Sequence, residues 1–472
     1  MSKPVSISNL RLSAGLVAAK ATATAIRRVG RGGGTSAPGL VAERVDPALL
    51  TKLADRLPHG AIVVAGTNGK TTTSRMIADI LAANDWRVVH NRSGSNLVRG
   101  VISAFAAQAS VGGRPGGDVA VIETDEAAFP EVARLVRPRL VLLNNLFRDQ
   151  LDRYGELDTI ARTWGESLRK LPHSATVVYN ADDPGLTGVV DGLSCRVVPF
   201  GLDERRHTLD ALPHAADALT CFRCGADLAY HALYLSHLGN WYCPGCGNAR
   251  PRLATFGTDI ELQGVDSLSL TIDRGAESIR YAIGVPGLYN AYNTLAAVAA
   301  TRELGVAEET VQTALAMFRS AFGRIERVQY RNRQLTLALV KNPTGFNEVL
   351  RMLTAETGGL VVPTLIAIND LYADGRDVSW LWDVDFELLA SGDGHLGTTG
   401  LRGADMANRL KYAGVDVSRI RALPANLATA LDEFVNSVPA GEQAYILPTY
   451  TAMLHIRGVL ADRGAVETFW QQ

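Results

Sequence analysis

Short apolar runs separated by amphipathic stretches dominate the first 200 residues of the chain. Residues 61–65 (AIVVA) are continuously apolar, and 118–126, 139–145 and 176–180 contain similar runs. Runs of this length, bounded by Gly, Asn and Asp, are typical of strands buried on both faces of a parallel sheet. The stretches between them, such as 74–84, carry apolar residues at helical spacing. The pattern therefore predicts a doubly wound α/β domain.

The first 40 residues follow a different pattern. Residues 10–28 mix small apolar residues with four cations: Arg11, Lys20, Arg27 and Arg28. A secretory signal needs an uninterrupted apolar core, which Lys20 breaks. A basic amphipathic helix fits better, either as an ordinary surface helix or as one that touches a membrane surface. The Gly-rich residues 28–39 predict a flexible lead into the first ordered domain.

Composition narrows the class of protein. The chain has 472 residues, 47 Lys and Arg against 48 Asp and Glu, 47% hydrophobic residues and 20% charged residues. These values exclude a disordered chain, and the net charge of −1 argues against non-specific nucleic-acid binding. No apolar stretch is long enough to cross a membrane, and five cysteines do not indicate a disulfide scaffold. We expect a cytoplasmic protein of several domains.

The first chemical signal is a glycine-rich loop between the strand at 61–65 and the helix after it. The loop is Gly66, Thr67, Asn68, Gly69, Lys70, Thr71 and Thr72. Glycines let main-chain N–H groups approach phosphate, Lys70 neutralises the β- and γ-phosphates, and Thr71 can hold Mg²⁺. Val64 stands where the strict pattern has glycine, so a structural turn with a chance lysine is the alternative. The strand–loop–helix context favours a site for a nucleoside triphosphate.

A second acidic position lies on the strand predicted in 118–126. Glu123 falls at the end of this strand. Ligands of open parallel sheets bind beyond the carboxyl ends of the strands, so Glu123 is placed to act as a second Mg²⁺ group. An acidic residue after a strand is also common without any ligand.

Several motifs together resemble the Mur ligase family. They are GTNGKTTT, the Glu123 strand end, NN…RDQLDRYGE, NADDP, GLYNAYNTLAAVAA and FGRIERV, in that order. The resemblance implies ATP-dependent activation of a carboxylate as an acyl phosphate, followed by attack of an amine. It also implies nucleotide-side roles for Asn145, Asp182, Asp183, Asn290, Asn293 and Arg324. Gln150 follows Asp149 where the family usually has histidine.

The cysteines form a separate motif. Cys221 and Cys224 form one C-x-x-C pair, and Cys243 and Cys246 form another after eighteen residues. This is the spacing of a zinc ribbon, in which four thiolates make a closed, structural site. A redox pair is the alternative for either motif alone. The fifth cysteine, Cys195, is expected to be a small buried residue.

A Mur-ligase-like chain with such an insert resembles the branch of the family that forms the synthetase subunit of lipid II isoglutaminyl synthase. The segments 341–350 and 369–387 agree with this resemblance. Within the second, Asp370, Asp374 and Asp377 fall on a loop after a strand predicted at 365–370. Asp377 either caps the following turn or, as the resemblance implies, orients a catalytic histidine of a partner glutaminase, with Asp374 as the second choice. Of Trp380 and Trp382, either one is exposed as an interface anchor or both lie in the core.

The source of nitrogen follows from the cysteine count. Glutamine hydrolysis needs an activated cysteine nucleophile. Four cysteines are assigned to zinc, and Cys195 lacks a Gly-x-Cys-x-Gly setting. If the chain makes an amide from glutamine, a second polypeptide must therefore supply the ammonia. The resemblance implies that this partner is a class I glutamine amidotransferase (GatD-like) in a heterodimer.

The sequence thus predicts a Mur-ligase-like α/β architecture with four parts. These are an N-terminal segment (1–44), a central ATP-binding domain (45–322), a zinc ribbon inserted in it (218–252) and an α/β C-terminal domain (323–472). The resemblance implies amidation of the α-carboxyl of D-glutamate in the lipid II stem peptide, with ATP and Mg²⁺, at the inner face of the membrane. The alternatives are an amino-acid-adding Mur-type or folylpolyglutamate-type ligase, and a non-enzymatic nucleotide switch with the ribbon as docking module.

Overall fold

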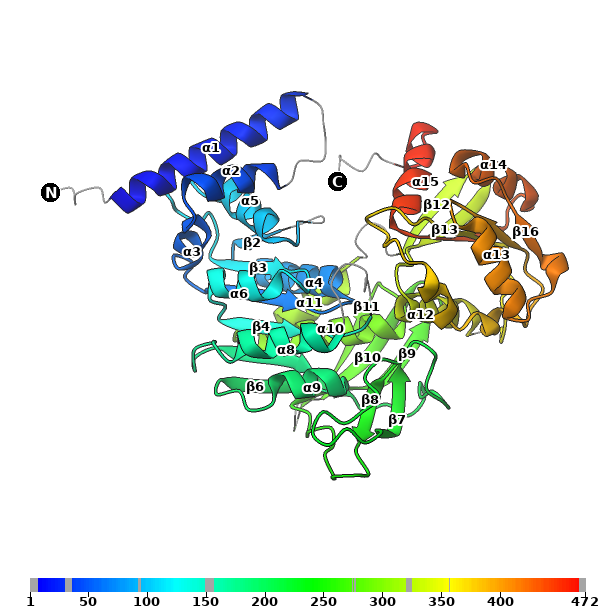
Figure 1. Cartoon of the computed structure of the whole chain (residues 1–472), viewed down its shortest axis with the longest axis horizontal. Helices are drawn as coiled ribbons and strands as arrows, with labels where there is room; N and C mark the ends of the chain where they lie inside the picture. Colours follow the sequence, from blue (N-terminus) through cyan, green and yellow to red (C-terminus); the bar gives the residue numbers. More distant parts are fainter. Residues whose placement is uncertain are drawn as a thin grey trace.

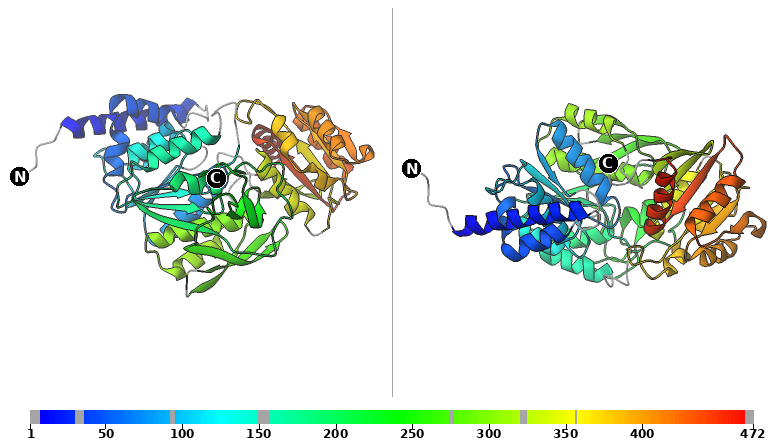
Figure 2. Two further views of the ribbon diagram at one scale, coloured as in Figure 1. Left: turned by 60° about the horizontal axis from the view of Figure 1, so that its bottom comes forward. Right: turned by 90° about the horizontal axis from the view of Figure 1, so that it is seen from above.

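The computed structural model describes residues 7–29, 36–91, 95–148, 157–273, 275, 277–319, 325–355 and 357–466. Two separate sheets organise these residues, and they lie side by side in Figures 1 and 2. A small two-stranded hairpin is the third β element. Each large sheet is covered by helices on both faces.

The larger sheet has nine strands. They are β1 (Ala61–Ala65), β2 (Val88–His90), β3 (Val119–Glu123), β4 (Leu140–Leu143), β5 (Thr176–Asn180), β6 (Arg196–Leu202), β9 (Thr255–Gln263), β10 (Ser267–Asp273) and β11 (Ser278–Ile283). Their spatial order is β11-β10-β9-β6-β5-β4-β1-β3-β2. Neighbours from β2 to β9 are parallel, whereas β9, β10 and β11 are antiparallel. Since β1 lies between β3 and β4, the loops after these three strands meet at one edge.

Helices cover both faces of this sheet because its central parallel strands, β1, β3 and β4, bury every residue alternately on two sides. Ile62 and Val64 of β1 face one core, with α4 (Lys70–Ala83), α10 (Leu288–Glu303) and α11 (Glu308–Met317). Ala61, Val63 and Ala65 face the other core. That core is closed by α3 (Leu49–Ala54), α5 (Val98–Gln108), α6 (Phe129–Val136), α8 (Leu157–Leu168) and α9 (Pro184–Val190).

The N-terminal segment adds an outer layer to the second core. It consists of α1 (Ile7–Val29) and α2 (Ala37–Val45), which lie over α5 in Figure 1. Leu12, Leu16 and Ala19 of α1 are buried in the core, so the predicted amphipathic helix forms and packs by its apolar face. Part of the predicted Gly-rich lead lies outside the described residues.

The second large sheet has six strands. They are β12 (Ile325–Tyr330), β13 (Arg333–Ala338), β14 (Thr364–Ala367), β15 (Leu396–Thr399), β16 (Ile420–Ala422) and β17 (Gln443–Pro448), in the order β12-β13-β17-β14-β15-β16. Only β12 pairs antiparallel. One face carries α12 (Pro343–Thr354), α13 (Gly403–Tyr412) and the 3₁₀ turns η1 (Ser379–Asp383) and η2 (Phe386–Leu389), and the other carries α14 (Leu427–Ser437) and α15 (Tyr450–Asp462). A third 3₁₀ turn, η3 (Val417–Arg419), leads into β16.

The predicted fold class is confirmed, with two large, mostly parallel sheets and a four-cysteine insert. Each large sheet together with the helices on its two faces is called an α/β layer below. The insert contains β7 (Ala229–Leu235) and β8 (Leu238–Tyr242), which pair as a hairpin. In the sequence this hairpin lies between β6 and β9. The strand expected at 365–370 is shorter, because pairing with β15 and β17 ends at Ala367. Residues 368–370 already belong to the loop at the carboxyl edge.

Candidate functional site

The glycine-rich loop turns sharply at its two glycines. Gly66 and Gly69 have φ of 145° and 81°, values that side-chain-bearing residues rarely adopt. A Cβ on Gly69 would lie 2.0 Å from Oδ1 of Asn293, so α10 packs directly against the loop. Helix α4 begins at Lys70, and its N-terminal N–H groups face the same edge as the loop. The loop therefore has the conformation that a phosphate cradle requires.

The lysine of the loop is buried and paired. The Lys70 ammonium donates to the carbonyl of Gly66, to that of Thr67 (3.0 Å) and to Oε2 of Glu126 (3.1 Å). Glu126, on the loop after β3, is itself buried, and its Oε1 accepts no hydrogen bond among the described residues. Sequence reasoning missed Glu126, although it lies three residues beyond the acidic position that was singled out.

The structure brings together the two residues predicted to hold Mg²⁺. The Thr71 hydroxyl donates to Oε1 of Glu123 at 3.0 Å, and the Glu123 side chain is buried. Asn91 fixes the Glu123 main chain from both sides, accepting from its N–H (2.9 Å) and donating to its carbonyl (2.7 Å). A hydroxyl and a carboxylate at this spacing are suitable oxygen ligands for one Mg²⁺ ion.

Asparagines surround the loop and fix its shape. Asn145 accepts from the Asn68 N–H at 2.8 Å, and its side-chain amide donates to the Asn68 carbonyl at 3.2 Å. On the helix side, Thr73 donates to Asn293 (3.2 Å), which donates to Asn290 (2.9 Å). Asn145, Asn290 and Asn293, predicted to be nucleotide-side residues, thus lie within one network around the loop.

The N-cap residue of α12, a helix that packs on the second sheet, reaches this loop. The amide of Asn342 donates to Oδ1 of Asn68 at 2.9 Å, and Asn342 also caps α12 by accepting from the Gly345 N–H. The phosphate loop therefore touches the start of α12, which belongs to the other α/β layer. The Asn-Pro pair before a helical pattern was the sequence signal for this cap, but nothing in the sequence indicated its contact with Asn68.

The two aspartates of NADDP are buried and hold the fold at this edge. Asp182 accepts from the Leu202 N–H (2.7 Å), from Arg250 (2.7 Å) and from the Tyr292 hydroxyl (2.8 Å). Burial raises the pKa of its carboxyl, and these donors oppose that effect. Asp183 accepts from the Leu146 N–H and caps α9. Their nucleotide-side role stays a prediction, as does that of Arg324, which lies outside the described residues together with Asp149 and Gln150.

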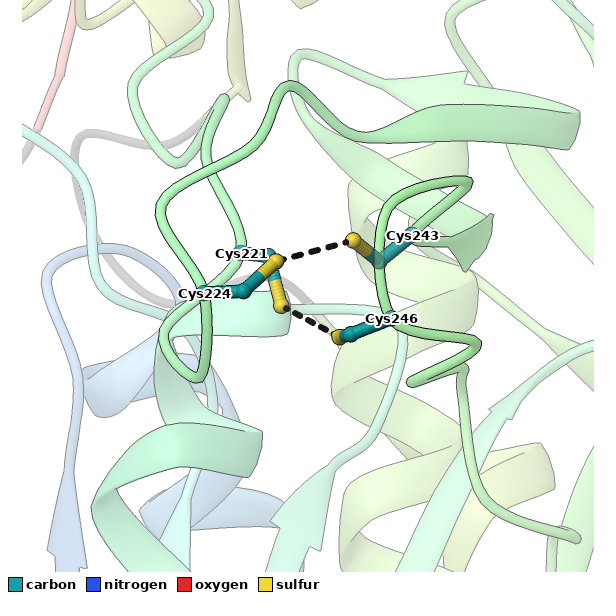
Figure 3. A group of neighbouring side chains, drawn as sticks. All are labelled: Cys221, Cys224, Cys243 and Cys246. Carbon is teal, nitrogen blue, oxygen red and sulfur yellow. Dashed lines mark hydrogen bonds between the residues drawn. The ribbon is translucent and has the colours of Figure 1, made fainter.

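The four predicted metal ligands form one cluster, shown in Figure 3. Their Sγ atoms all lie within 4.8 Å of one another, at 3.7 Å for Cys221 and Cys246 and 3.4 Å for Cys224 and Cys243. Four thiolates around one tetrahedral ion have sulfur–sulfur distances of about 3.8 Å. Burial opposes ionisation of Cys221, but the N–H groups of Arg223 and Cys224 outweigh it and lower the pKa of that thiol to about 6. The cluster therefore fits a tetrahedral metal ion.

The insert that carries the cysteines is anchored on the NADDP loop. The indole of Trp241, fully buried beside Cys221 and Cys243, donates to the Ala181 carbonyl at 3.0 Å. Arg250 bridges Asp182 and the Leu202 carbonyl. A closed metal centre would thus rigidify the hairpin that holds this edge of the large sheet. The fifth cysteine, Cys195, is buried as predicted, and burial raises the pKa of its thiol.

The three aspartates of the acidic segment differ in surroundings. Asp374 is buried and accepts from the Thr451 N–H (2.8 Å) and hydroxyl (2.5 Å), which ties its loop to α15. Asp370 pairs with Arg402 at 2.8 Å. Asp377 is exposed and accepts from the N–H of Ser379, the first residue of η1, at 2.8 Å, whereas Val378 holds the N-cap position. The Ser379 main chain and hydroxyl lower the pKa of Asp377, which keeps it ionised at neutral pH.

Large apolar side chains are exposed around this segment. We call them the carboxyl-edge patch, because they follow the ends of β14, β15 and β17: Leu371, Tyr372, Leu401, Tyr450 and Leu454. Tyr372 and Leu401 are 68% and 56% exposed. Nearby on η1, Trp382 is exposed whereas Trp380 packs on the core beside Phe346, so the two do not both lie in the core.

Comparison with known proteins identifies the family. Residues 64–222 match the model of the Mur ligase middle domain, and residues 339–453 match that of the MurT ligase C-terminal domain. The chain is 33% identical over 97% of its length to subunit MurT of the glutamine-hydrolysing lipid II isoglutaminyl synthase of Streptococcus pneumoniae, of which it covers 99%. The chain belongs to the MurT family. Subunit MurT of Staphylococcus aureus is also 33% identical, over 87% of this chain and 90% of that protein.

Membership of the MurT family makes the chain a ligase subunit with a Mur ligase fold. A solved pseudomurein peptide ligase type C of Methanothermus fervidus superposes with a TM-score of 0.69 at 18% identity, covering 88% of this chain and 80% of its own. Mur ligases use ATP with Mg²⁺. Among the described helices of this MurT-family chain, none has the length and apolar character to cross a bilayer.

Proposed function

We propose that this MurT-family chain amidates the α-carboxyl of D-glutamate in the lipid II stem peptide to D-isoglutamine. The γ-phosphoryl group of ATP moves to a carboxylate oxygen, and ADP leaves. The lone pair of ammonia then attacks the acyl carbon. Phosphate departs with the former carboxylate oxygen and takes up the proton that nitrogen loses.

The residues at the nucleotide edge suit the first half of this reaction. Thr71 and Glu123 would hold Mg²⁺ against the phosphates, and Lys70 would exchange Glu126 for the γ-phosphate. Because the loop and its lysine are buried, these charges act where water screens them weakly. Asn342 would bring the second α/β layer against the loop, where the acceptor carboxylate must lie.

One observation carries the proposal of a separate nitrogen supply. The chain is similar over nearly its whole length to subunits named as parts of a glutamine-hydrolysing synthase, yet none of its five cysteines suits glutamine hydrolysis. Four of them form the cluster that could hold a metal ion, and burial raises the pKa of the Cys195 thiol. A glutaminase needs an accessible thiolate. The ammonia must then come from a partner, which we propose is a class I glutamine amidotransferase.

The carboxyl-edge patch is the surface where that partner would bind. Exposed tyrosines such as Tyr372 and Tyr450 are typical of protein interfaces, where aromatic side chains are enriched. Asp377, which is ionised, exposed and five residues beyond Tyr372 in the chain, is the best candidate to orient a histidine of the partner. Asp374 is better suited to hold the loop in position, since its carboxylate is buried against Thr451.

The four cysteines would hold one structural zinc ion. Two C-x-x-C knuckles with all four positions filled by sulfur leave no open site for catalysis. Zinc would therefore stabilise the hairpin against the NADDP loop and take no part in the reaction.

The acyl-phosphate step can be tested by following oxygen. Lipid II labelled with ¹⁸O in the α-carboxylate of D-glutamate is incubated with ATP, Mg²⁺, ammonium and the full chain. We expect the released phosphate to carry one ¹⁸O atom per amide formed, and the Lys70→Ala variant to release none. Phosphate without label alongside amidated product would contradict the acyl phosphate. ATP hydrolysis that responds to an added amino acid, with a peptide of correspondingly greater mass, would instead favour the amino-acid-adding alternative.

A further inference from the structure

The N-terminal layer carries a strong excess of positive charge. Residues 1–60 contain nine Lys and Arg against three Asp and Glu, a net charge of +6 in a chain whose total is −1. Helix α1 itself contains four cations and no acidic residue. The remaining 412 residues must then carry a net charge of −7. This separation of charge gives the molecule a cationic end, which an average over the whole chain conceals.

A line of apolar residues runs along the outward face of α1. Its buried side packs on α2, α3 and α5, whereas Leu10 and Val17 are 59% and 51% exposed. Ala14 and Ala21 are exposed as well. At 3.6 residues per turn, positions 10, 14, 17 and 21 fall within about 40° of one line along the helix. Among the described residues no element covers this line, and Figures 1 and 2 show α1 on the outside of the molecule.

The cations frame the apolar line. On the same helical geometry Arg11 lies on one flank and Arg27 on the other, and Arg28 continues the line at the C-terminal end. All three are exposed. An apolar line bordered by arginines on a helix lying flat is the arrangement that binds the headgroup region of a membrane. Of the four residues on this line, Leu10 and Val17 are large, whereas Ala14 and Ala21 are small. Attraction between the arginines and anionic lipid would therefore supply most of the binding free energy.

We infer that the outer face of α1 is a docking surface for anionic membrane lipid. The inference rests on the proposed function in one respect, namely that a lipid-linked substrate gives the chain a reason to reside at a membrane. Binding would orient the molecule with the N-terminal layer against the bilayer. A second copy of the chain is a poorer occupant, because two such faces would bring like charges together.

Vesicle sedimentation tests the inference on the full chain. The probes are vesicles of phosphatidylcholine alone and of phosphatidylcholine with phosphatidylglycerol, at low and high salt. We expect binding only to the anionic vesicles, weakened by salt, and a loss of about tenfold or more in the variant Arg11→Glu/Arg27→Glu/Arg28→Glu. The matched control, Arg169→Glu/Lys170→Glu/Arg302→Glu, makes the same change of charge at exposed positions elsewhere and should bind like the unaltered chain.

Three results would overturn the inference. They are equal loss in both variants, undiminished binding by the α1 variant, and equally tight, α1-dependent binding to duplex nucleic acid at the same salt. A concentration-dependent dimer that the α1 variant abolishes, without vesicle binding, would assign the face to a second copy instead. Amidation of lipid II in detergent micelles keeps this test apart from the proposed function: the α1 variant should retain that activity, whereas vesicle binding without any amidation would contradict only the proposed function.

Discussion

Lys70 and Glu126 form a buried ion pair where the phosphates are expected to bind. The lysine is held by two carbonyls of its own loop and by one carboxylate oxygen, while the other oxygen of Glu126 has no hydrogen-bond donor among the described residues. A buried carboxylate with an unsatisfied oxygen is costly, and phosphate offers the lysine more negative charge. The loop is thus built to exchange an internal anion for an external one.

The Thr71 hydroxyl provides a sharp test of the Mg²⁺ assignment. Thr71→Val keeps the shape of the side chain but removes the oxygen that lies 3.0 Å from Glu123. We expect kcat for Mg²⁺-dependent ATP turnover to fall by about 100-fold. Thr71→Ser restores the hydroxyl and should stay within a few-fold of the unaltered chain. Equal activity of the valine and serine variants would show that this oxygen does not hold the metal.

Asp182 is a buried carboxylate that stabilises the folded chain. It is fully buried and pairs with Arg250, whose side chain is only 9% exposed. Asp182→Asn should lower the free energy of unfolding by about 3 kcal/mol, because it leaves the guanidinium buried without a counter-charge. The exposed pair of Asp191 and Arg223 provides the control, and Asp191→Asn should cost less than about 0.5 kcal/mol. Urea unfolding measures both, and similar costs would refute the argument.

At the scale of elements, the strands of the large sheet follow directly from local sequence. The runs predicted at 61–65 and 176–180 coincide with β1 and β5, and the two between them end within two or three residues of β3 and β4. Buried parallel strands are continuously apolar, so they are readable without knowledge of their neighbours. In the antiparallel strands β9 to β11, buried residues are interspersed with exposed and half-buried ones, and these strands were not predicted.

The contacts that assemble the site, unlike the strands, do not follow from local sequence. Asn342 meets Asn68 across 274 positions of sequence, and Arg250 meets Asp182 across 68. No local pattern records such pairs, because they depend on how the layers stack. The residue types at the site were predictable from spacing, whereas their partners required the structure. The cysteine cluster is the exception, since its ligands are paired by a spacing that the sequence shows.

The hairpin of β7 and β8 should depend on its metal ion. We expect about one zinc ion per chain by elemental analysis, because four thiolates form one closed tetrahedral site. Cys243→Ser should lose the metal and expose residues 221–246 to proteolysis. Cys195→Ser, at the cysteine outside the cluster, should keep both metal and resistance. Full zinc content in the Cys243→Ser variant would contradict the assignment.

At the scale of the whole molecule, three ion pairs between described residues join the two α/β layers. Arg148 pairs with Asp383 at 3.4 Å, and His214 with Asp385 at 3.2 Å. Arg327 of β12 pairs with Asp266, in the turn between β9 and β10, and all three pairs are partly exposed. Exposed pairs of this kind are individually weak and screened by salt. Such pairs contribute little to holding the two layers in this arrangement.

Removing the Arg148–Asp383 and His214–Asp385 pairs should loosen the contact between the two α/β layers without unfolding either layer. His214→Ala/Asp383→Ala should raise KM for ATP by about two- to fivefold and enlarge the radius of gyration measured by small-angle X-ray scattering. His173→Ala/Asp393→Ala, which changes the same residue types at exposed positions outside this junction, is the matched control. An unchanged radius and KM in the first variant would mean that other contacts hold the layers together.

The central claim is a division of labour, in which this chain forms the amide and a partner releases the ammonia. Mass spectrometry of lipid II tests it directly, with ATP and Mg²⁺, with ammonium or glutamine, and with or without the glutaminase partner. The account predicts a product about 1 Da lighter, from OH replaced by NH₂, with ammonium in every case but with glutamine only when the partner is present. Amidation from glutamine by this chain alone, or no amidation from either donor while ATP is hydrolysed, would contradict it.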